Sequence, residues 1–212
     1  MEQGYRSVRK RTAVEIERKR SRFIGIAAPV PDAIGAEAEI ARAREEYPGA
    51  SHYCYAYRAG LDALVVRMSD AGEPQGTAGR PMLEVLERNE LVNVCVVVVR
   101  YFGGTLLGAA GLVRAYSAAA SEAVAEAGIV SFAAHVLLRV HFDYADWSRA
   151  ERALRSSGTL VTGVEYGENV AVEVAAPKER TADFEDLVTQ LTAGRSAVHR
   201  IGERFLPTAP ES

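Results

Sequence analysis

The spacing of hydrophobic positions changes repeatedly between two periods along the chain. Strand-like runs, alternating or β-branched, are separated by longer runs in which apolar residues recur every three or four positions. In the first 128 residues the predicted strands are Thr12–Ile16, Arg22–Ala28, His52–Arg58, Leu64–Met68 and Val94–Val99. The predicted helices there are Ile34–Tyr47, Pro81–Asn89 and Ala109–Ala127. This mixture of elements indicates an α+β fold.

One stretch combines the strongest strand signal with two glycine-rich turns. Val94–Val99 is almost unbroken apolar and β-branched, which is typical of a strand buried on both faces. The sequence SDAGEPQGTAGRP precedes it, and RYFGGTLLGAAG follows it. Glycine is favoured where the backbone bends sharply or approaches another group closely, because it has no Cβ. We therefore expect the N-terminal half to be organised around these two turns.

The pattern after Gly128 predicts a second domain. Its elements follow the order β-α-β-β-α-β, which is the order of the ferredoxin-like split arrangement. We therefore predict a domain of residues 1–128, a ferredoxin-like domain of residues 129–206 and a tail of residues 207–212. The predicted strands and helices of the second domain are, in chain order, Phe132–Phe142, Ala145–Ser156 (helix), Thr159–Tyr166, Val170–Ala176, Thr181–Leu191 (helix) and Ala197–Phe205.

The residues around the two turns resemble those of a known family. SDAGEPQGTAGRPMLEVL and VVVVRYFGGTLLGAAGLVRAY are similar to the signature of the IMPACT/YigZ family, and the segments SRFIG (Ser21–Gly25) and HYCYAYR (His52–Arg58) match its earlier blocks. The resemblance covers nearly the whole chain. The sequence departs from the family pattern at Ala71, where a second acid is usual, near Leu106, where a lysine is usual, and at Ala110, where a glycine is usual.

The resemblance implies both a fold and a general role. Family members have an amino-terminal domain similar to the second domain of the small-subunit ribosomal protein numbered five. Bacterial members add a ferredoxin-like domain similar to the last domain of elongation factor G. Both of these relatives belong to translation, and eukaryotic members are tied to the control of initiation through a stress-responsive kinase pathway. The resemblance therefore implies a translation-associated regulatory protein that binds RNA, the ribosome or a translation factor.

The amino-acid composition limits the class of protein and the kinds of site that we expect. The chain is 48% hydrophobic and 25% charged, which is ordinary for a globular protein, and no apolar run approaches the length of a membrane span. The charged amino terminus lacks the apolar segment of a signal peptide, so we expect a cytoplasmic protein without a membrane partner. Cys54 and Cys95 lie far from any C-x-x-C spacing, which argues against a disulfide framework or a zinc site. No cofactor is predicted.

The net charge of −3 conceals a basic segment. Residues 1–22 contain eight Arg or Lys residues and three acidic ones. Such an arm attracts nucleic-acid phosphates. The structural alternative is that these side chains protect an exposed sheet edge from pairing with another chain. Because the chain as a whole is acidic, we expect modest rather than tight binding to RNA.

Candidate binding residues come from the basic arm, the tyrosine-rich strand and the second glycine-rich turn. The cations would contact phosphates, the tyrosines would stack on bases, and the glycines would expose backbone amides at a helix amino terminus. Structural alternatives remain: the tyrosines pack under a helix, and the glycines allow close packing of a helix on a sheet. The predicted binding residues are Arg22, His52, Tyr55, Arg100, Tyr101, Gly103, Gly104, Gly108, Gly111 and Arg114.

Asp70 and Glu73 are the candidate catalytic residues of an alternative function, that of an enzyme. In an enzyme acting on a small phosphorylated or peptide-like substrate they would be a general base or magnesium ligands, with Arg100 holding a phosphate. The absent acid and lysine of the family pattern count against this hypothesis. In the binding hypothesis the two acids orient the arginines or cap the following helix. His52 and Cys54 share one strand face and could form a base and a nucleophile, although the sequence identifies no third, orienting residue.

Overall fold

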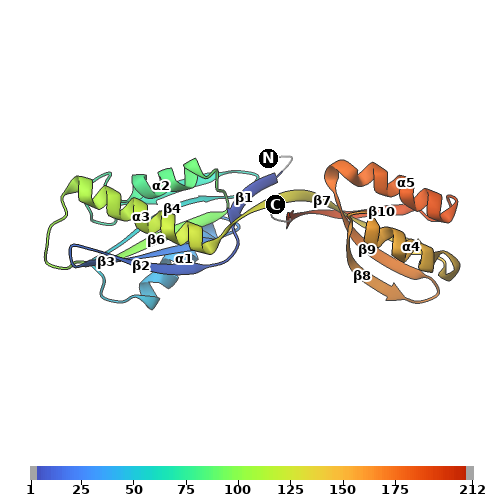
Figure 1. Ribbon diagram of the computed structural model, residues 1–212, viewed down its shortest axis with the longest axis horizontal. Coiled ribbons are helices and arrows are strands. Elements are labelled where there is room, and N and C mark those ends of the chain that lie inside the picture. Colours follow the sequence, from blue (N-terminus) through green and yellow to red (C-terminus); the bar gives the residue numbers. More distant parts are fainter. Residues whose placement is uncertain (1–3, 209–212) are drawn as a thin grey trace. The chain divides into compact units, whose positions relative to one another are not determined.

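The computed structural model describes residues 4–208. Residues 5–131 form one compact unit, and residues 132–208, grouped with Gly4, form the other. Each unit combines helices with an antiparallel sheet, so the predicted α+β class is confirmed (Figure 1). Within the described residues, no helix is long and apolar enough to cross a membrane.

The first unit is a sheet with helices on both faces (Figure 1). The strand order is β2-β3-β6-β4-β5, and all neighbours are antiparallel. One core cluster joins the sheet to α1, and the other joins it to α2 and α3. The elements are β1 (Gly4–Val8), β2 (Thr12–Arg18), β3 (Ser21–Pro29), α1 (Ala33–Glu46), β4 (His52–Ala59), β5 (Val65–Ser69), α2 (Gly79–Arg88), β6 (Val94–Tyr101) and α3 (Ala109–Ala127).

β6 is the central strand of this sheet, and both of its faces are covered. Val94, Val96 and Val98 belong to the cluster under α2 and α3, whereas Val97 and Val99 belong to the cluster under α1. All five side chains are fully buried. The prediction from the unbroken apolar run is therefore confirmed, because alternate residues of a strand point to opposite faces.

The small residues of α3 allow that helix to lie close to the sheet. A Cβ on Gly25 of β3 would come within 2.3 Å of the carbonyl oxygen of Ala119. No side chain fits in that space, so glycine on the strand and alanines on the helix are required. The alanine-rich run thus sets the distance between α3 and β3.

The start of the chain differs from the prediction, which contained no strand before Thr12. β1 contacts the segment that precedes β6, where the amide of Val92 donates to the carbonyl of Arg6 at 2.8 Å. β2, which carries part of the basic arm, is the edge strand of the sheet. This position agrees with the alternative in which the charges protect an edge.

The second unit has the predicted β-α-β-β-α-β order. Four strands of its five-stranded sheet are arranged β10-β7-β9-β8, each antiparallel to its neighbour, and one apolar cluster joins the sheet to both α-helices. β10 extends to Pro207, the first residue of the predicted tail, whereas residues 209–212 of that tail lie outside the described residues. The elements are β7 (Ile129–Phe142), α4 (Tyr144–Ser156), β8 (Leu160–Tyr166), β9 (Val170–Pro177), the short 3₁₀ helix η1 (Lys178–Arg180), α5 (Thr181–Thr192) and β10 (Val198–Pro207).

Candidate functional site

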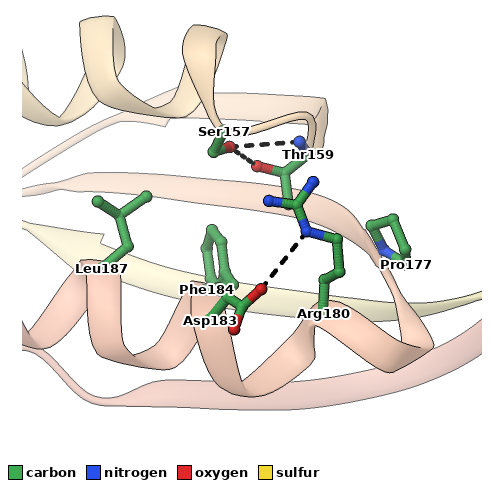
Figure 2. A pocket seen from close by; sticks show the side chains of 7 residues that line it. All are labelled: Ser157, Thr159, Pro177, Arg180, Asp183, Phe184 and Leu187. Carbon is green, nitrogen blue, oxygen red and sulfur yellow. Dashed lines mark hydrogen bonds and ion pairs between the residues drawn. The ribbon is translucent and has the colours of Figure 1, made fainter.

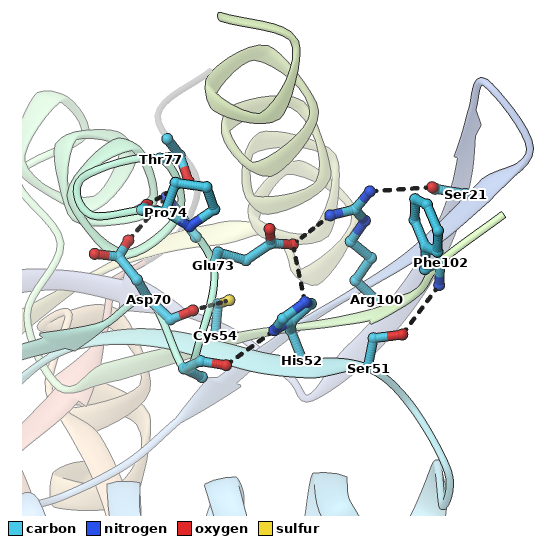
Figure 3. A network of polar contacts seen from close by, with 12 residues as sticks. Ser21, Ser51, His52, Cys54, Asp70, Glu73, Pro74, Thr77, Arg100 and Phe102 are labelled. Carbon is cyan, nitrogen blue, oxygen red and sulfur yellow. Dashed lines mark hydrogen bonds and ion pairs between the residues drawn. The ribbon is translucent and has the colours of Figure 1, made fainter. Parts of the chain in front are cut away.

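Arg100 lies at the end of β6, where the two glycine-rich turns meet. In the sheet register it is opposite Phe23 of β3 on one side and His52 of β4 on the other. Its side chain is only 6% exposed and reaches the first turn, where Nη1 donates to Glu73 Oε1 at 2.6 Å (Figure 3). The strand register thus brings together two candidate residues that are far apart in the sequence.

Glu73 is the centre of this polar network. Besides the bond from Arg100, its Oε1 accepts a hydrogen bond of 2.6 Å from the hydroxyl of Tyr116 on α3. His52 Nε2 lies 3.9 Å from the same oxygen. Burial raises the pKa of Tyr116, so this hydroxyl stays protonated and remains a donor. The carboxylate is therefore held by two donors from different elements.

Arg100 is also enclosed by aromatic rings. Its guanidinium carbon lies 5.3 Å from the ring centre of Phe23 and 5.4 Å from that of Phe102, and its Nη2 donates to Ser21 Oγ at 3.3 Å. Among residues 4–208, Arg100 Nε is the one buried side-chain nitrogen or oxygen without a hydrogen-bond partner. Because its charge is already paired with Glu73 and its surface is covered, Arg100 supports the turn rather than offering a free cation to a ligand.

Asp70 organises the loop that leads into α2. Its carboxylate accepts backbone hydrogen bonds from Gly76 at 2.8 Å, Ala78 at 3.0 Å and Gly79 at 2.8 Å. Partial burial raises the pKa of Asp70, but these three donors outweigh it, so the pKa lies below its ordinary value. Both oxygens are occupied by backbone donors of the protein. The acid therefore acts as a cap for the start of α2, one of the two structural roles predicted for it.

His52 and Cys54 each contact a backbone carbonyl of this loop rather than one another. His52 Nδ1 lies 3.0 Å from the carbonyl oxygen of Ala71, and Cys54 donates to the carbonyl oxygen of Asp70 at 3.0 Å (Figure 3). Burial raises the pKa of Cys54 to about 12. A thiol in this state is a poor nucleophile at neutral pH. The geometry does not support a base and nucleophile made from this pair.

The second glycine-rich turn lies directly against the hairpin between β2 and β3. A Cβ on Gly103 would come within 2.0 Å of the carbonyl oxygen of Arg20, and the Gly103 amide donates to Ser21 Oγ at 3.2 Å. Arg18, the last residue of β2, and the turn residues Lys19 and Arg20 are all exposed, and these three residues are called the basic turn below. Lys19 and Arg20 have positive φ values of 47° and 65°. The contact places three exposed basic residues beside the glycine-rich turn.

The other three glycines of this turn have different surroundings. Gly104 and Gly108 have φ values of 78° and 73° and open space where a Cβ would be. Gly111 lies inside α3, where a Cβ would meet only the side chain of Leu107, at 3.0 Å. Gly104 and Gly108 are therefore required by backbone conformation, and Gly103 by close approach.

α3 begins directly after the glycine-rich turn. Its N-cap is Gly108, which offers no side-chain hydrogen bond to the first turn of the helix. Arg114, on the following turn, is exposed and has no ion pair among residues 4–208. Phe102, at the start of the loop, is 47% exposed. This end of the first unit therefore presents unpaired donors and one exposed aromatic ring.

Three predicted binding residues lie away from this network. Tyr55 and Tyr101 pack against the core cluster under α1, and Tyr55 stacks on the ring of Tyr57 at 6.2 Å. Tyr101 donates to the carbonyl of Pro48. Arg22 forms a two-point ion pair with Glu15 and lies over the Tyr101 ring. The tyrosines are therefore placed as the structural alternative predicts, under a helix.

Sequence reasoning missed several residues of this region. Ser21 and Tyr116 complete the buried network, and Phe102 belongs to the exposed part, beside Lys19 and Arg20 of the predicted basic arm. The sequence contains an indication for Tyr116, because its side chain carries a hydroxyl group within a helix made mostly of small, apolar residues. Among residues 4–208, no group of three or more His, Cys, Asp or Glu residues is arranged to hold a metal ion.

Comparisons with known proteins show which family the chain belongs to. Residues 19–124 match the model described as the Impact N-terminal domain, and residues 140–195 match a domain of unknown function (DUF1949). The protein is 36% identical to "IMPACT family member YvyE" of Bacillus subtilis (strain 168), over 92% of this chain and 90% of that protein. The chain belongs to the IMPACT family.

Other relatives agree with this membership. "IMPACT family member YigZ" of Escherichia coli (strain K12) is 34% identical over 86% of this chain and 90% of its own length. A solved structure described as "Crystal structure of an hypothetical protein" superimposes with a TM-score of 0.63 at 30% identity, covering 95% of this chain and 98% of that one. The likeness to IMPACT proteins thus spans both units.

Proposed function

We propose that this IMPACT protein is a translation-associated regulatory protein that binds RNA, free or in the ribosome, through the basic turn and the glycine-rich turn of its first unit. In this proposal the first unit is a relative of the second domain of the small-subunit ribosomal protein numbered five. The second unit is a ferredoxin-like domain, related to the last domain of elongation factor G. The β-α-β-β-α-β order and the strand order β10-β7-β9-β8 support the second assignment.

The proposed binding surface is inferred from one contact between two segments of the first unit. The close approach of Gly103 to Arg20 joins the exposed basic residues Arg18, Lys19 and Arg20 to the glycine-rich turn and the amino end of α3. Guanidinium and ammonium groups, together with helix-terminal amides, are the donors that phosphates accept. Phe102 adds an exposed ring on which a base could stack.

The acids of the first turn favour this function over an enzyme that uses them. Asp70 is occupied by three backbone donors, and Glu73 is 3% exposed and paired with Arg100. Neither carboxylate is free to take a proton from a substrate without breaking bonds that hold the loop. At this end Lys19, Arg20 and Arg114 have no ion pair within residues 4–208, and such cationic donors suit an anionic partner.

A salt-dependent binding measurement tests the proposal. Full-length protein is titrated against labelled single-stranded RNA over a series of salt concentrations, and log Kd is plotted against log salt. Lys19→Asn combined with Arg20→Asn removes two charges while keeping residue types that tolerate positive φ. We expect weaker binding and a slope smaller by about one unit or slightly more. Arg88→Gln, on the last turn of α2, is the matched control and should leave the slope unchanged.

The class of partner follows from a pull-down out of cell lysate at low salt, with and without ribonuclease. Retention of ribosomal RNA or free RNA that is lost after ribonuclease supports the proposal. Equal slopes for wild type and the double variant would refute the basic turn as the binding surface. Capture of a translation factor that persists after ribonuclease would replace RNA by protein as the partner. Turnover of a phosphorylated compound that Asp70→Asn abolishes in a folded protein would favour the enzyme.

A further inference from the structure

The second unit contains a small pocket that the proposed function does not use. It has a volume of about 190 Å³ and lies between the end of α4, the end of β9 and the first turns of α5 (Figure 2). Its apolar side is formed by Pro177, Phe184 and Leu187, and Phe184 is only 3% exposed. Its polar side is formed by Ser157, Thr159, Arg180 and Asp183. The pocket therefore has an apolar surface facing three side chains that can donate hydrogen bonds and one carboxylate, Asp183.

Arg180 is held against the turn that follows α4. A Cβ on Gly158 would lie 3.2 Å from Arg180 Nη1, so the guanidinium is next to the backbone of this turn. Gly158 has a φ of 76°, a conformation in which a residue with a Cβ is strained. The sequence Ser157-Gly158-Thr159 thus places two hydroxyl groups beside one guanidinium, and Figure 2 shows these groups close together.

The charge of Arg180 is only weakly compensated. Its ion pair is with Asp183, and this contact joins Nε to Oδ2 at 3.5 Å between side chains that are 53% and 71% exposed. Exposed pairs of this kind contribute little binding energy. The pairing uses Nε, which leaves the two terminal nitrogens directed toward the Ser157–Thr159 turn (Figure 2). Asp183 therefore orients the guanidinium without neutralising its outer face.

The hydroxyl protons can also be assigned. Ser157 Oγ donates to the carbonyl of Leu154 at 2.8 Å and accepts from the amide of Thr159 at 3.2 Å. The hydroxyls of Ser157 and Thr159 contact each other, and since the proton of Ser157 is used, Thr159 is the donor in that contact. Rotation of the Thr159 hydroxyl would give this proton to a ligand oxygen instead. One neutral donor and two charged donors then face the pocket.

We propose that this pocket binds a small phosphate monoester. The phosphate accepts hydrogen bonds from the terminal nitrogens of Arg180 and from the hydroxyl of Thr159, and the organic part lies against Phe184 and Leu187. A guanidinium presents its donors in a geometry that matches phosphate oxygens. The volume is below the range typical of drug-sized ligands, so a compact ester fits better than a whole nucleotide.

Phenyl phosphate is the probe, because it joins a monoester phosphate to a compact apolar group. Amide chemical shifts of the full-length ¹⁵N-labelled protein are followed during titration. We expect saturable shifts at Gly158, Thr159 and Arg180. Inorganic phosphate should bind more weakly because it lacks the apolar part, and dimethyl phosphate, which represents an RNA backbone diester, should bind more weakly than phenyl phosphate.

Two variants and one control locate the site. Arg180→Gln should weaken the binding of phenyl phosphate by about tenfold or more, because it removes charged hydrogen bonds. Thr159→Val should weaken it by a smaller factor, and thermal melting checks that both variants fold. Arg152→Gln removes an exposed charge of α4 outside the pocket and should leave the affinity unchanged.

Three results would overturn this site. The first is the absence of saturable shifts at Gly158 and Thr159. The second is an equal loss of affinity in Arg152→Gln and Arg180→Gln, which would show unspecific attraction by charge. The third is tighter binding of dimethyl phosphate than of phenyl phosphate, which would assign the surface to an RNA backbone rather than to a monoester.

Discussion

Arg100 and Glu73 form a buried ion pair, with 2.6 Å between Nη1 and Oε1 and side chains that are 6% and 3% exposed. The pair joins the end of the central strand to the first glycine-rich turn, and Tyr116 attaches the same carboxylate to α3. The central strand, the first glycine-rich turn and α3 are therefore joined through the single carboxylate of Glu73.

Removal of Glu73 should destabilise the protein strongly. Glu73→Ala leaves the guanidinium of Arg100 buried without its partner, and we expect a loss of about 3–5 kcal/mol in the free energy of unfolding. Urea denaturation followed by circular dichroism measures this loss. Glu84→Ala, which removes an exposed ion-pair partner on α2, should cost less than about 1 kcal/mol.

Removal of both charges should cost less than removal of one. The double variant Glu73→Leu, Arg100→Met leaves no buried charge, so it should be more stable than Glu73→Ala. If Glu73→Ala unfolded at the same urea concentration as the wild type, the central structural role of the pair would be wrong.

Asp70 should make stability depend on pH in the acid range. Its folded-state pKa lies below the ordinary value of 3.8, so its contribution is fully present above that value and is lost as the pH falls through the lower, folded-state pKa. Denaturation at a series of pH values from about 6 to 2 should show a shallower decline for Asp70→Asn than for wild type. At neutral pH the variant should lose about 1 kcal/mol through the weakened cap. Parallel pH profiles for the two proteins would contradict the predicted role of Asp70.

Gly103 and Gly104 should respond differently to a side chain. Gly103→Ala forces its Cβ against the carbonyl of Arg20, so it should cost well over 1 kcal/mol and displace the basic turn. Gly104→Ala meets open space and should cost about 1–2 kcal/mol through its positive φ alone. Gly104→Asn should be milder, because asparagine tolerates that conformation. Thermal melting and RNA binding of the three variants check the order, and a wild-type melting temperature for Gly103→Ala would refute the close approach.

The C-terminal half should fold without the rest of the chain. A fragment of residues 129–208 contains all strands and helices of the second unit and their apolar cluster. We expect a single cooperative thermal transition, because a sheet face covered by two helices forms its own core. A soluble fragment that melts gradually, without a heat-absorption peak in calorimetry, would show that the unit depends on the N-terminal half.

The sequence by itself determined the elements and the family. The valine run of β6, the helical spacing of α1 and the β-α-β-β-α-β order of the second half all appear in the structure with small shifts at their ends. Side-chain periodicity follows directly from local backbone geometry, and so a single sequence can report it. Asp32, predicted to cap α1, does accept a hydrogen bond from the amide of Gly35.

Only the tertiary structure decided how the candidate residues are used. Arg100 looked like a phosphate ligand in the sequence, yet the register of three strands places it against Glu73, Ser21 and two rings. Tyr55 and Tyr101 were both named as stacking groups for bases, with packing under a helix as the favoured alternative for the row of Tyr55, and the strand face on which they lie puts both under α1. The basic turn lies beside the glycines because Gly103 packs against the backbone of Arg20 and donates to Ser21 Oγ. Such contacts join residues far apart in the chain, and their pairing depends on the packing of the whole domain rather than on local spacing.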